Sequence, residues 1–314
     1  MAGPNTGLSP NSVKSGLDEV FYTEFDYAEA PGVATATDPI FFRQKSTQLG
    51  AVQTEEFLPP GEWETHQEEE EVRISTVRTG NKATHTVVNY KKALKIPVEY
   101  WEDEYLDVVD NAIERMGMRA RTTRDKTALQ SYPNGFSSFN TNAGTDLWSN
   151  SHTNLNGDTI DNLETGTLTP GNVEILFRSL MEQKAQDGEG AGHQPAGVLV
   201  PPILFPDLNE ILDSELKPGT AQNELNYFSH VYPGLQPRQS IWIGAAYSSA
   251  TNANTSYYVV SRNHSITRWE RIGMDTSLTD YTFDDQDRYT YKGRYREVYA
   301  AIGYEGCAAS NGSV

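Results

Sequence analysis

Residues 96–132 read IPVEYWEDEYLDVVDNAIERMGMRARTTRDKTALQSY, and this stretch decides the fold class. Apolar residues recur in it at spacings of three and four: Leu106, Val109, Ile113, Met116 and Ala120. The periodicity predicts one apolar stripe on a helix from about Glu102 to Ser131. Such a helix spans ~45 Å at 1.5 Å per residue, which is long for a globular core and typical of a structural spine. Pro133-Asn134-Gly135 is expected to end it.

The segment before this helix, residues 44–98, is predicted to be extended, rich in strands and highly charged. Turn signals at 59–61 and 79–82 divide it. If the second turn closes a hairpin, Glu70 faces Lys91 and Glu69 faces Lys92. Two interpretations of the four glutamates at 68–71 stay open: a solvated face, or pairing with the two lysines within a strand or between subunits. The segment has too few apolar residues to bury itself, so we expect it to be solvated or to lie on a neighbouring copy.

Residues 1–45 are predicted to form an extended N-terminal arm. Glycine and proline punctuate it, and two apolar groups at 20–22 and 40–42 could anchor it to the body.

Downstream of a polar loop at 134–167, the pattern alternates between helix and strand. Thr169 and Pro170 predict the start of a second helix, with Thr169 as its N-cap. A buried strand at 197–200, a helix at 206–216 and a strand at 240–245 follow. This alternation predicts a compact α/β region. From 257 to 304 the apolar period changes to two, which predicts long antiparallel strands.

Composition excludes several classes of function. The 314 residues carry 25 Lys+Arg and 43 Asp+Glu, a net charge of −18 that argues against tight binding to a phosphate backbone. The single Cys307 excludes an internal disulfide framework and fits a reducing compartment. The start of the chain has no pattern of a secretory signal, and its apolar runs are far shorter than the ~20 residues that span a bilayer. We therefore predict a protein without a membrane segment.

No pattern in the sequence predicts catalysis, and we expect no cofactor and no resident metal. The usual nucleophile, zinc and phosphate-loop motifs are missing from the sequence. The one cluster of potential metal ligands, Asp146, His152 and Asp158, does not have the spacing of a Ca²⁺ loop. A metal-dependent hydrolase that uses these residues remains an alternative of a different class.

The order of these segments resembles the major capsid protein of tailed bacteriophages. The residues that carry the resemblance are DLWSNSHTNL at 146–155, LTPGNVE at 168–174 and VLVPP at 198–202, together with 59–64 and 96–98. The local match is best to the Mu-like major head subunit branch. The resemblance implies an α+β fold with an N-terminal arm, an extended β-loop, a long spine helix, an axial α/β domain and a peripheral domain with long antiparallel strands.

The resemblance also implies a division of the chain into domains. These are an arm at 1–45, an extended loop at 46–96, a spine helix with part of the peripheral domain at 97–167, an axial domain at 168–247 and peripheral-domain strands at 248–314.

On the same resemblance, we expect a non-enzymatic subunit that forms hexamers and pentamers of an icosahedral shell around double-stranded DNA. Its partners would be copies of itself, a separate scaffolding protein, a portal, a decoration protein and the packaged DNA, which it would touch weakly and without sequence specificity. An acidic inner surface would let the DNA slide. The chain would be assembled in the host cytoplasm and end in the virion. An encapsulin-like cellular shell is the alternative with the same fold.

The side chains that we expect to contact neighbouring subunits are charged or aromatic residues of the extended loop and the long strands. They are Trp63, Glu69, Glu70, Arg73, Arg78, Lys82, Lys91, Lys92, Trp269, Arg271, Arg294 and Arg296.

Overall fold

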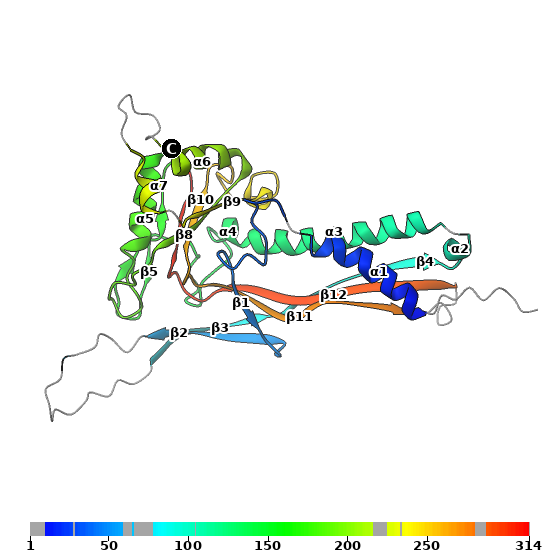
Figure 1. Cartoon of the computed structure of the whole chain (residues 1–314). Helices are drawn as coiled ribbons and strands as arrows, with labels where there is room; N and C mark the ends of the chain where they lie inside the picture. Colours follow the sequence, from blue (N-terminus) through cyan, green and yellow to red (C-terminus); the bar gives the residue numbers. More distant parts are fainter. Residues whose placement is uncertain are drawn as a thin grey trace, which may run out of the picture.

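A compact end and an elongated end make up the chain in the computed structural model (Figure 1). The structure describes residues 10–313 apart from 28, 59–64, 66–77, 104, 216–224, 233 and 280–286. The mixture of helices and sheets agrees with the predicted α+β class. In the described part of the chain, no helix combines the length and the apolar character needed to cross a bilayer.

A four-stranded sheet in the order β1-β11-β12-β4 forms the elongated end. β11 (Ile266–Thr279) and β12 (Arg288–Ala301) pair antiparallel, as the period of two predicts. β4 (Val88–Pro97) lies antiparallel on the far side of β12, and β1 (Arg43–Ser46) lies parallel to β11 on the other edge. Along β12, buried residues alternate with more exposed ones, because the described residues cover only one face of this part of the sheet.

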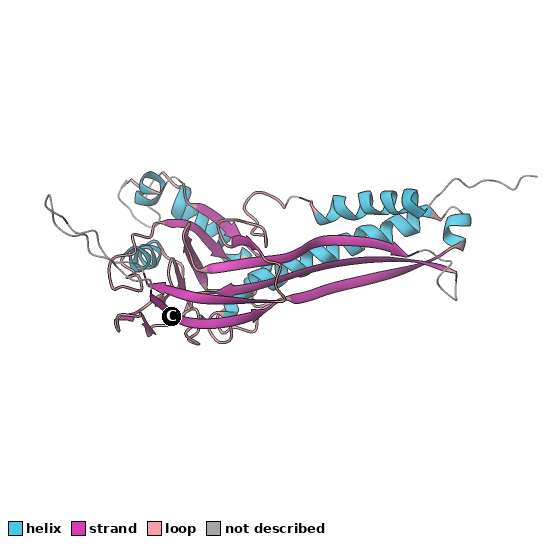
Figure 2. Ribbon diagram, turned by 90° about the horizontal axis from the view of Figure 1, so that it is seen from below, coloured by secondary structure: helices cyan, strands magenta, loops and turns pink. Residues whose placement is uncertain are grey.

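Helices cover that face. α3 (Leu106–Leu129) is the predicted spine, but the helical stretch is divided: α2 (Glu99–Glu102) precedes it and α4 (Ser131–Asn134) follows. The 24 residues of α3 span ~36 Å, shorter than predicted. Pro133 lies inside α4 rather than beyond the helix, a position in the first turn where its missing N–H costs nothing. Figures 1 and 2 place α3 and α1 on the same side of the long strands.

α1 (Pro10–Phe25) corrects the prediction of an extended arm. Four buried residues spaced by four form one stripe along it: Val13, Leu17, Phe21 and Phe25. The stripe packs against Val109, Ile113 and Met116 of α3. A Cβ at Gly117 would lie 2.4 Å from the carbonyl oxygen of Phe21, so glycine permits the two helices to approach closely. Pro10 is the first residue of the helix, where proline starts a helix rather than breaking it.

Arginines of α3 hold the chain that leaves α1. Arg124 lies over the ring of Phe25, 4.4 Å from its centroid, and Arg121 pairs with Glu29 at 3.4 Å. This supports a structural role for these two arginines of the spine.

The anchor at 40–42 is confirmed. Phe41 and Phe42 are fully buried, and the hydroxyl of Tyr132 donates to the carbonyl of Phe41 at 2.8 Å. The indole N–H of Trp148 in turn donates to the carbonyl of Tyr132 at 2.7 Å. This cluster joins the end of the spine to both sheets.

A five-stranded sheet in the order β7-β13-β10-β8-β9 forms the compact end. Its strands are β7 (Leu163–Glu164), β13 (Cys307–Ser310), β10 (Tyr257–Ser261), β8 (Pro195–Val200) and β9 (Gln236–Gln239). The three central strands are buried along their whole length. Chain from the last sixty residues therefore enters both sheets. The division of the chain into domains stays a prediction.

Helices α5 (Pro170–Met181), α6 (Phe205–Asp213) and α7 (Tyr227–Val231) pack on this sheet. The predicted N-cap is confirmed, since the side chain of Thr169 accepts a hydrogen bond from the backbone N–H of Asn172. The predicted strand at 240–245 is wrong: a 3₁₀ turn, Ile241–Ile243, follows β9, because the Ser240 side chain caps it by accepting from the Trp242 N–H. A second 3₁₀ turn, Pro202–Leu204, precedes α6. β5 (His152–Thr153) and β6 (Thr159–Ile160) form a small hairpin within the polar loop.

β2 (Ala51–Leu58) and β3 (Arg78–Thr86) form a separate two-stranded antiparallel ribbon beneath the compact end in Figure 1. This corrects the predicted hairpin at 79–82, which lies inside β3. Lys91 and Lys92 instead face Arg294 and Gly293 of β12. Thr79-Gly80-Asn81-Lys82 resembles a turn in composition, but pairing with β2 keeps it extended. Glu69 and Glu70 lie outside the described residues.

Candidate inter-subunit surfaces

The root of the β2–β3 ribbon is fixed to the body by buried polar contacts. The hydroxyl of Thr54 lies 3.0 Å from Nε2 of His85 and donates to Oδ1 of Asn142 at 2.8 Å. The ring of His85 stacks on Trp269 of β11, with 6.3 Å between centroids. The ribbon therefore leaves the body from a defined position.

Two carboxyl groups, one buried and one half-buried, face a small cavity between the ribbon and the compact end. Glu56 of β2 accepts hydrogen bonds from the backbone and the side chain of Asn81, and burial raises its pKa. Glu305 accepts from the backbone N–H of Gln186, and its pKa is raised by burial and by the neighbouring charges of Asp187 and Glu56. Both line a cavity of about 260 Å³. The root of the ribbon thus carries carboxyl groups that burial holds toward the neutral form.

The predicted contact residues fall into separate places. Trp63, Glu69, Glu70 and Arg73 lie outside the described residues, so their role stays a prediction. The others lie on strands of the ribbon and the long sheet: Arg78 and Lys82 on β3, Lys91 and Lys92 on β4, Trp269 and Arg271 on β11, Arg294 and Arg296 on β12.

Trp269 packs within its own chain. It is 5% exposed and lies against Val52 and Ala300, with the Lys45 ammonium 5.7 Å from its ring. Lys82 pairs with Glu55 across the ribbon at 2.7 Å. In the subunit itself, these two residues stabilise the ribbon and its root.

The uncovered face of the long sheet is basic. Side chains that alternate with the buried tyrosines of β12 point to this face, and so do their register partners on β4. The cations on it are Lys91, Lys95, Arg288, Lys292, Arg294 and Arg296. On β11, Asp275 pairs with Arg294 at 2.8 Å. We call this surface the basic sheet face; its charge is opposite in sign to that of the whole chain.

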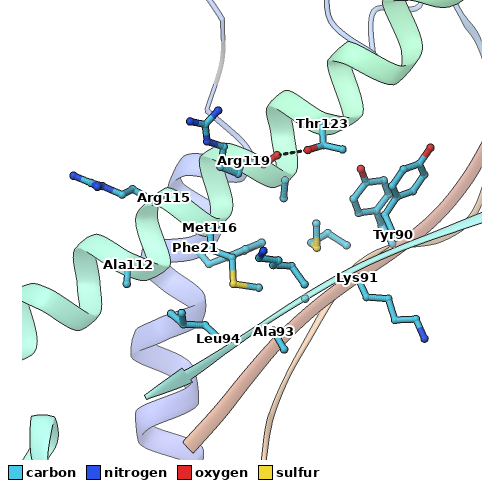
Figure 3. A pocket seen from close by; sticks show the side chains of 15 residues that line it. Phe21, Tyr90, Lys91, Ala93, Leu94, Ala112, Arg115, Met116, Arg119 and Thr123 are labelled. Atoms are coloured by element: carbon cyan, nitrogen blue, oxygen red, sulfur yellow. Dashed lines mark hydrogen bonds between the residues drawn. The ribbon is translucent and has the colours of Figure 1, made fainter. Parts of the chain in front are cut away.

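An open groove lies on the opposite face of the sheet, between α3 and β4 (Figure 3). It encloses about 580 Å³, and its floor is mostly apolar, with Leu94, Met116, Phe21 and Tyr295 among its lining residues. Tyr295 stacks on Tyr90 with 4.8 Å between centroids. Its buried hydroxyl has no hydrogen-bond partner among the described residues.

Small side chains leave this groove open. Ala112 and Ala120 on α3 and Gly293 on β12 line it. A Cβ at Gly293 would lie only 3.4 Å from Met116, so the layer between helix and sheet is thin there. α1 fills the space on the other flank of α3, but in the described chain nothing fills this one.

Cations surround the mouth of the groove. Figure 3 shows Arg115 and Arg119 on the rim formed by α3, both pointing outward. Lys91 of β4 borders the groove, but its side chain points away from α3, to the basic sheet face. Lys92 is the register partner of Gly293, which lines the groove. The side chain of Lys92 therefore lies on the groove side of β4. The sequence indicates that this half of α3 is basic, but the groove itself depends on the pairing of β4 with β12, which no local pattern predicts.

His152, the residue considered for a metal site, is part of the packing. Its Nε2 lies 3.1 Å from the carbonyl oxygen of Leu147, and its ring stacks on Tyr304 with 5.1 Å between centroids. Burial lowers its pKa. In the described ranges, no three side chains of His, Cys, Asp or Glu are grouped so that they could hold a metal ion.

Comparison with known proteins identifies the family to which this architecture belongs. The family model described as "Phage capsid protein" matches residues 82–310, from the ribbon to the last strand of the compact end. The chain belongs to the phage capsid protein family. It is a major capsid protein, a structural protein of the bacteriophage virion shell. No curated protein sequence matches it.

Solved capsid structures share the fold of this capsid protein at low identity. The capsid of Ralstonia phage GP4 is 11% identical, with 90% of each chain covered and a TM-score of 0.57. A virus-like particle from Pyrococcus furiosus is 8% identical, with 94% of this chain and 98% of that chain covered and a TM-score of 0.53. The capsid of cyanophage P-SCSP1u is 12% identical, with 90% of each chain covered and a TM-score of 0.50. These similarities confirm the capsid fold.

Proposed function

We propose that this capsid protein assembles into hexamers and pentamers of an icosahedral shell that encloses double-stranded DNA, without a catalytic step of its own. The observation that carries the proposal is the combination of a rooted β2–β3 ribbon with a long sheet that leaves one face uncovered. A subunit built this way offers a projecting element and a surface to receive one. Such a head-to-tail contact is heterologous and closes into a ring by rotation.

The basic sheet face is the receiving surface in this proposal. Glu68-Glu69-Glu70-Glu71 lies in the segment that joins β2 to β3, and Lys91, Arg294 and Arg296 lie on the basic sheet face. The glutamates and the cations are opposite in sign, so the acidic run of one copy complements the face of a neighbour. The pairing of glutamates with lysines is then a contact between subunits instead of a hairpin within one chain.

Weak contacts between subunits are sufficient to form a closed ring. A single contact of millimolar affinity contributes about 4 kcal/mol. A subunit that engages several neighbours at once gains effective concentration, so the assembled ring is far more stable than any one contact. The ribbon loses conformational entropy in this process, and contacts with the neighbour offset it.

Further expectations follow from the sequence resemblance. The order of motifs at 146–155, 168–174 and 198–202 favours the Mu-like branch. We include a separate scaffolding protein, a portal and a decoration protein as partners, assembly in the host cytoplasm, and weak contact with the packaged DNA.

Negative-stain electron microscopy of the purified full chain, alone and with any scaffolding protein encoded beside it, tests the proposal. Closed shells or rings of five and six subunits are the expected result. Particles recovered from the infected host should hold DNA that resists added nuclease. A monodisperse monomer under both conditions would contradict shell assembly, and shells filled with protein cargo would favour an encapsulin-like role.

A further inference from the structure

The groove between α3 and β4 concentrates positive charge in an acidic protein. Three cations, Lys92, Arg115 and Arg119, carry their side chains on the side of the groove, and its described lining includes no carboxylate. None of the three forms an ion pair with a described residue, whereas Arg121 of α3 is paired. The chain as a whole carries a net charge of −18. An apolar floor between two basic rims therefore complements a ligand with an apolar edge and carboxylates on both sides.

The helix already packed beside the groove indicates which kind of element can pack against α3 and the sheet. α1 lies beside the groove on the same helix α3, and Phe21 belongs both to the stripe of α1 and to the lining of the groove. α1 is an acidic amphipathic helix with Glu19 exposed on its outer side. Asp18 accepts hydrogen bonds from the hydroxyls of Thr276 and Tyr291, each at 2.7 Å. One flank of α3 is thus already covered by an acidic amphipathic helix.

The dimensions of the open flank suit a second helix. The wall formed by α3 runs from Ala112 to Thr123, about three turns or roughly 16 Å. Arg115 and Arg119 are one turn apart, so their side chains are spaced by ~6 Å like carboxylates at positions i and i+4 of a docked helix. The small side chains of Ala112, Ala120 and Gly293 leave depth for two or three apolar anchors. This is the geometry of a helix laid in a groove.

We propose that the groove binds an acidic amphipathic helix from a different polypeptide, and that Arg115 and Arg119 on the side of α3 and Lys92 on the side of β4 select the carboxylates of that helix. The inference rests on the proposed function in one respect: the polypeptide is another component of shell assembly. The two possible occupants from a second copy of this chain, its α1 and its acidic segment at 62–77, are outcomes that the test separates.

The test measures binding of labelled peptides to the full chain by fluorescence anisotropy. The probe is a designed helix of 16 residues with leucines at i, i+4, i+7 and i+11 and glutamates on both flanks. The first control has the same leucines and lysines in place of the glutamates. Two further peptides copy residues 10–27 and 62–77 of this chain. We expect the acidic helix to bind at least roughly tenfold more tightly than the lysine version and than either copied peptide.

Variants locate the site. The triple variant Lys92→Glu, Arg115→Glu and Arg119→Glu changes exposed positions and should weaken binding of the acidic helix roughly tenfold or more. Arg115→Glu alone should give a smaller loss and keeps the test valid if the triple variant folds poorly. Lys292→Glu, the matched control on the basic sheet face, should leave binding unchanged.

Three results would overturn the inference. Equal affinity for the acidic and the lysine helix would remove charge selection. Loss of binding in Lys292→Glu but not in the triple variant would place the site on the other face. Tighter binding of either copied peptide would assign the groove to a second copy. Shells seen by electron microscopy alongside any of these results would leave the proposed function standing, so the two failures are distinguishable.

Discussion

The compact end and the elongated end bury their sheets differently. In the compact end, β8, β10 and β13 are buried on both faces, and α5, α6 and α7 complete the cover. In the elongated end, α1 and α3 cover one face, while β4 and β12 present exposed cations on the other. The first arrangement needs nothing outside the chain. The second leaves one face of its sheet without cover from the described part of the chain, as expected of a shell subunit whose surfaces meet neighbouring copies.

The largest expected effect comes from a charge in the compact core. Val259 of β10 is fully buried, so Val259→Asp places an unpaired carboxylate among apolar side chains. We expect a loss of at least about 4 kcal/mol in the free energy of unfolding, measured by urea denaturation. Lys292→Asp, exposed on the long sheet, should change this free energy by no more than ~0.5 kcal/mol. Similar losses for the two variants would show that the two ends are equally self-contained.

Removing the aromatic ring of Phe21 tests how firmly α1 packs on the sheet of the elongated end. Phe21 is fully buried between α1, α3 and β12, and its ring lies near those of Phe25 and Tyr291. Phe21→Ala should cost roughly 3–5 kcal/mol in α1 docking. Hydrogen exchange should then show lost protection in α1 and unchanged protection in β8 and β10. The exposed Glu19→Ala is the control. Lost protection throughout the chain would mean that the two ends unfold as one unit.

A change of pH is expected to have smaller effects on local stability, and these effects have opposite signs in α1 and in the β2–β3 ribbon. Burial opposes ionisation of Asp18, but hydrogen bonds from Lys14, Tyr291 and Thr276 outweigh it and lower its pKa below 3.8. Its contribution to α1 docking is therefore present above that value and is lost as the pH falls. Burial raises the pKa of Glu56 above 4.5, so its ionisation weakens the root of the ribbon as the pH rises through the raised value.

Hydrogen exchange corrected for intrinsic rates, from about pH 3 to about pH 7, measures both effects. Protection of α1 should fall toward acid and protection of β2–β3 should rise. Asp18→Asn should remove the first trend and Glu56→Gln the second. If both elements respond to pH in the same direction, the assignment of these two carboxyl groups is wrong.

Local patterns of the sequence predict the elements that depend on one stretch of chain. The stripe from Leu106 to Ala120 predicts the spine, Thr169 predicts the start of α5, and the period of two after 257 predicts β11 and β12. Each is confirmed because packing and propensity agree there.

The errors occur where distant chain decides the structure. Thr79-Gly80-Asn81-Lys82 has the composition of a turn, yet pairing with β2 makes it part of a strand. Glycine and proline in the first 45 residues suggest an extended arm, yet burial of the stripe of α1 against α3 outweighs them. The groove and the basic sheet face both arise from the pairing of β4 with β12, a contact between segments about two hundred residues apart in sequence. Single-segment patterns carry no information on such contacts.

The central claim is that the segment joining β2 and β3 connects neighbouring subunits. Leu58 and Arg78 are direct partners across the ribbon, so an Asn-Gly turn can replace residues 59–77 without disturbing either strand. Electron microscopy of the full chain and of this variant, under the same assembly conditions, is the most direct measurement. We predict closed shells from the full chain, and from the variant a folded subunit with the same circular dichroism and no shells. Shells of normal size from the variant would contradict the claim.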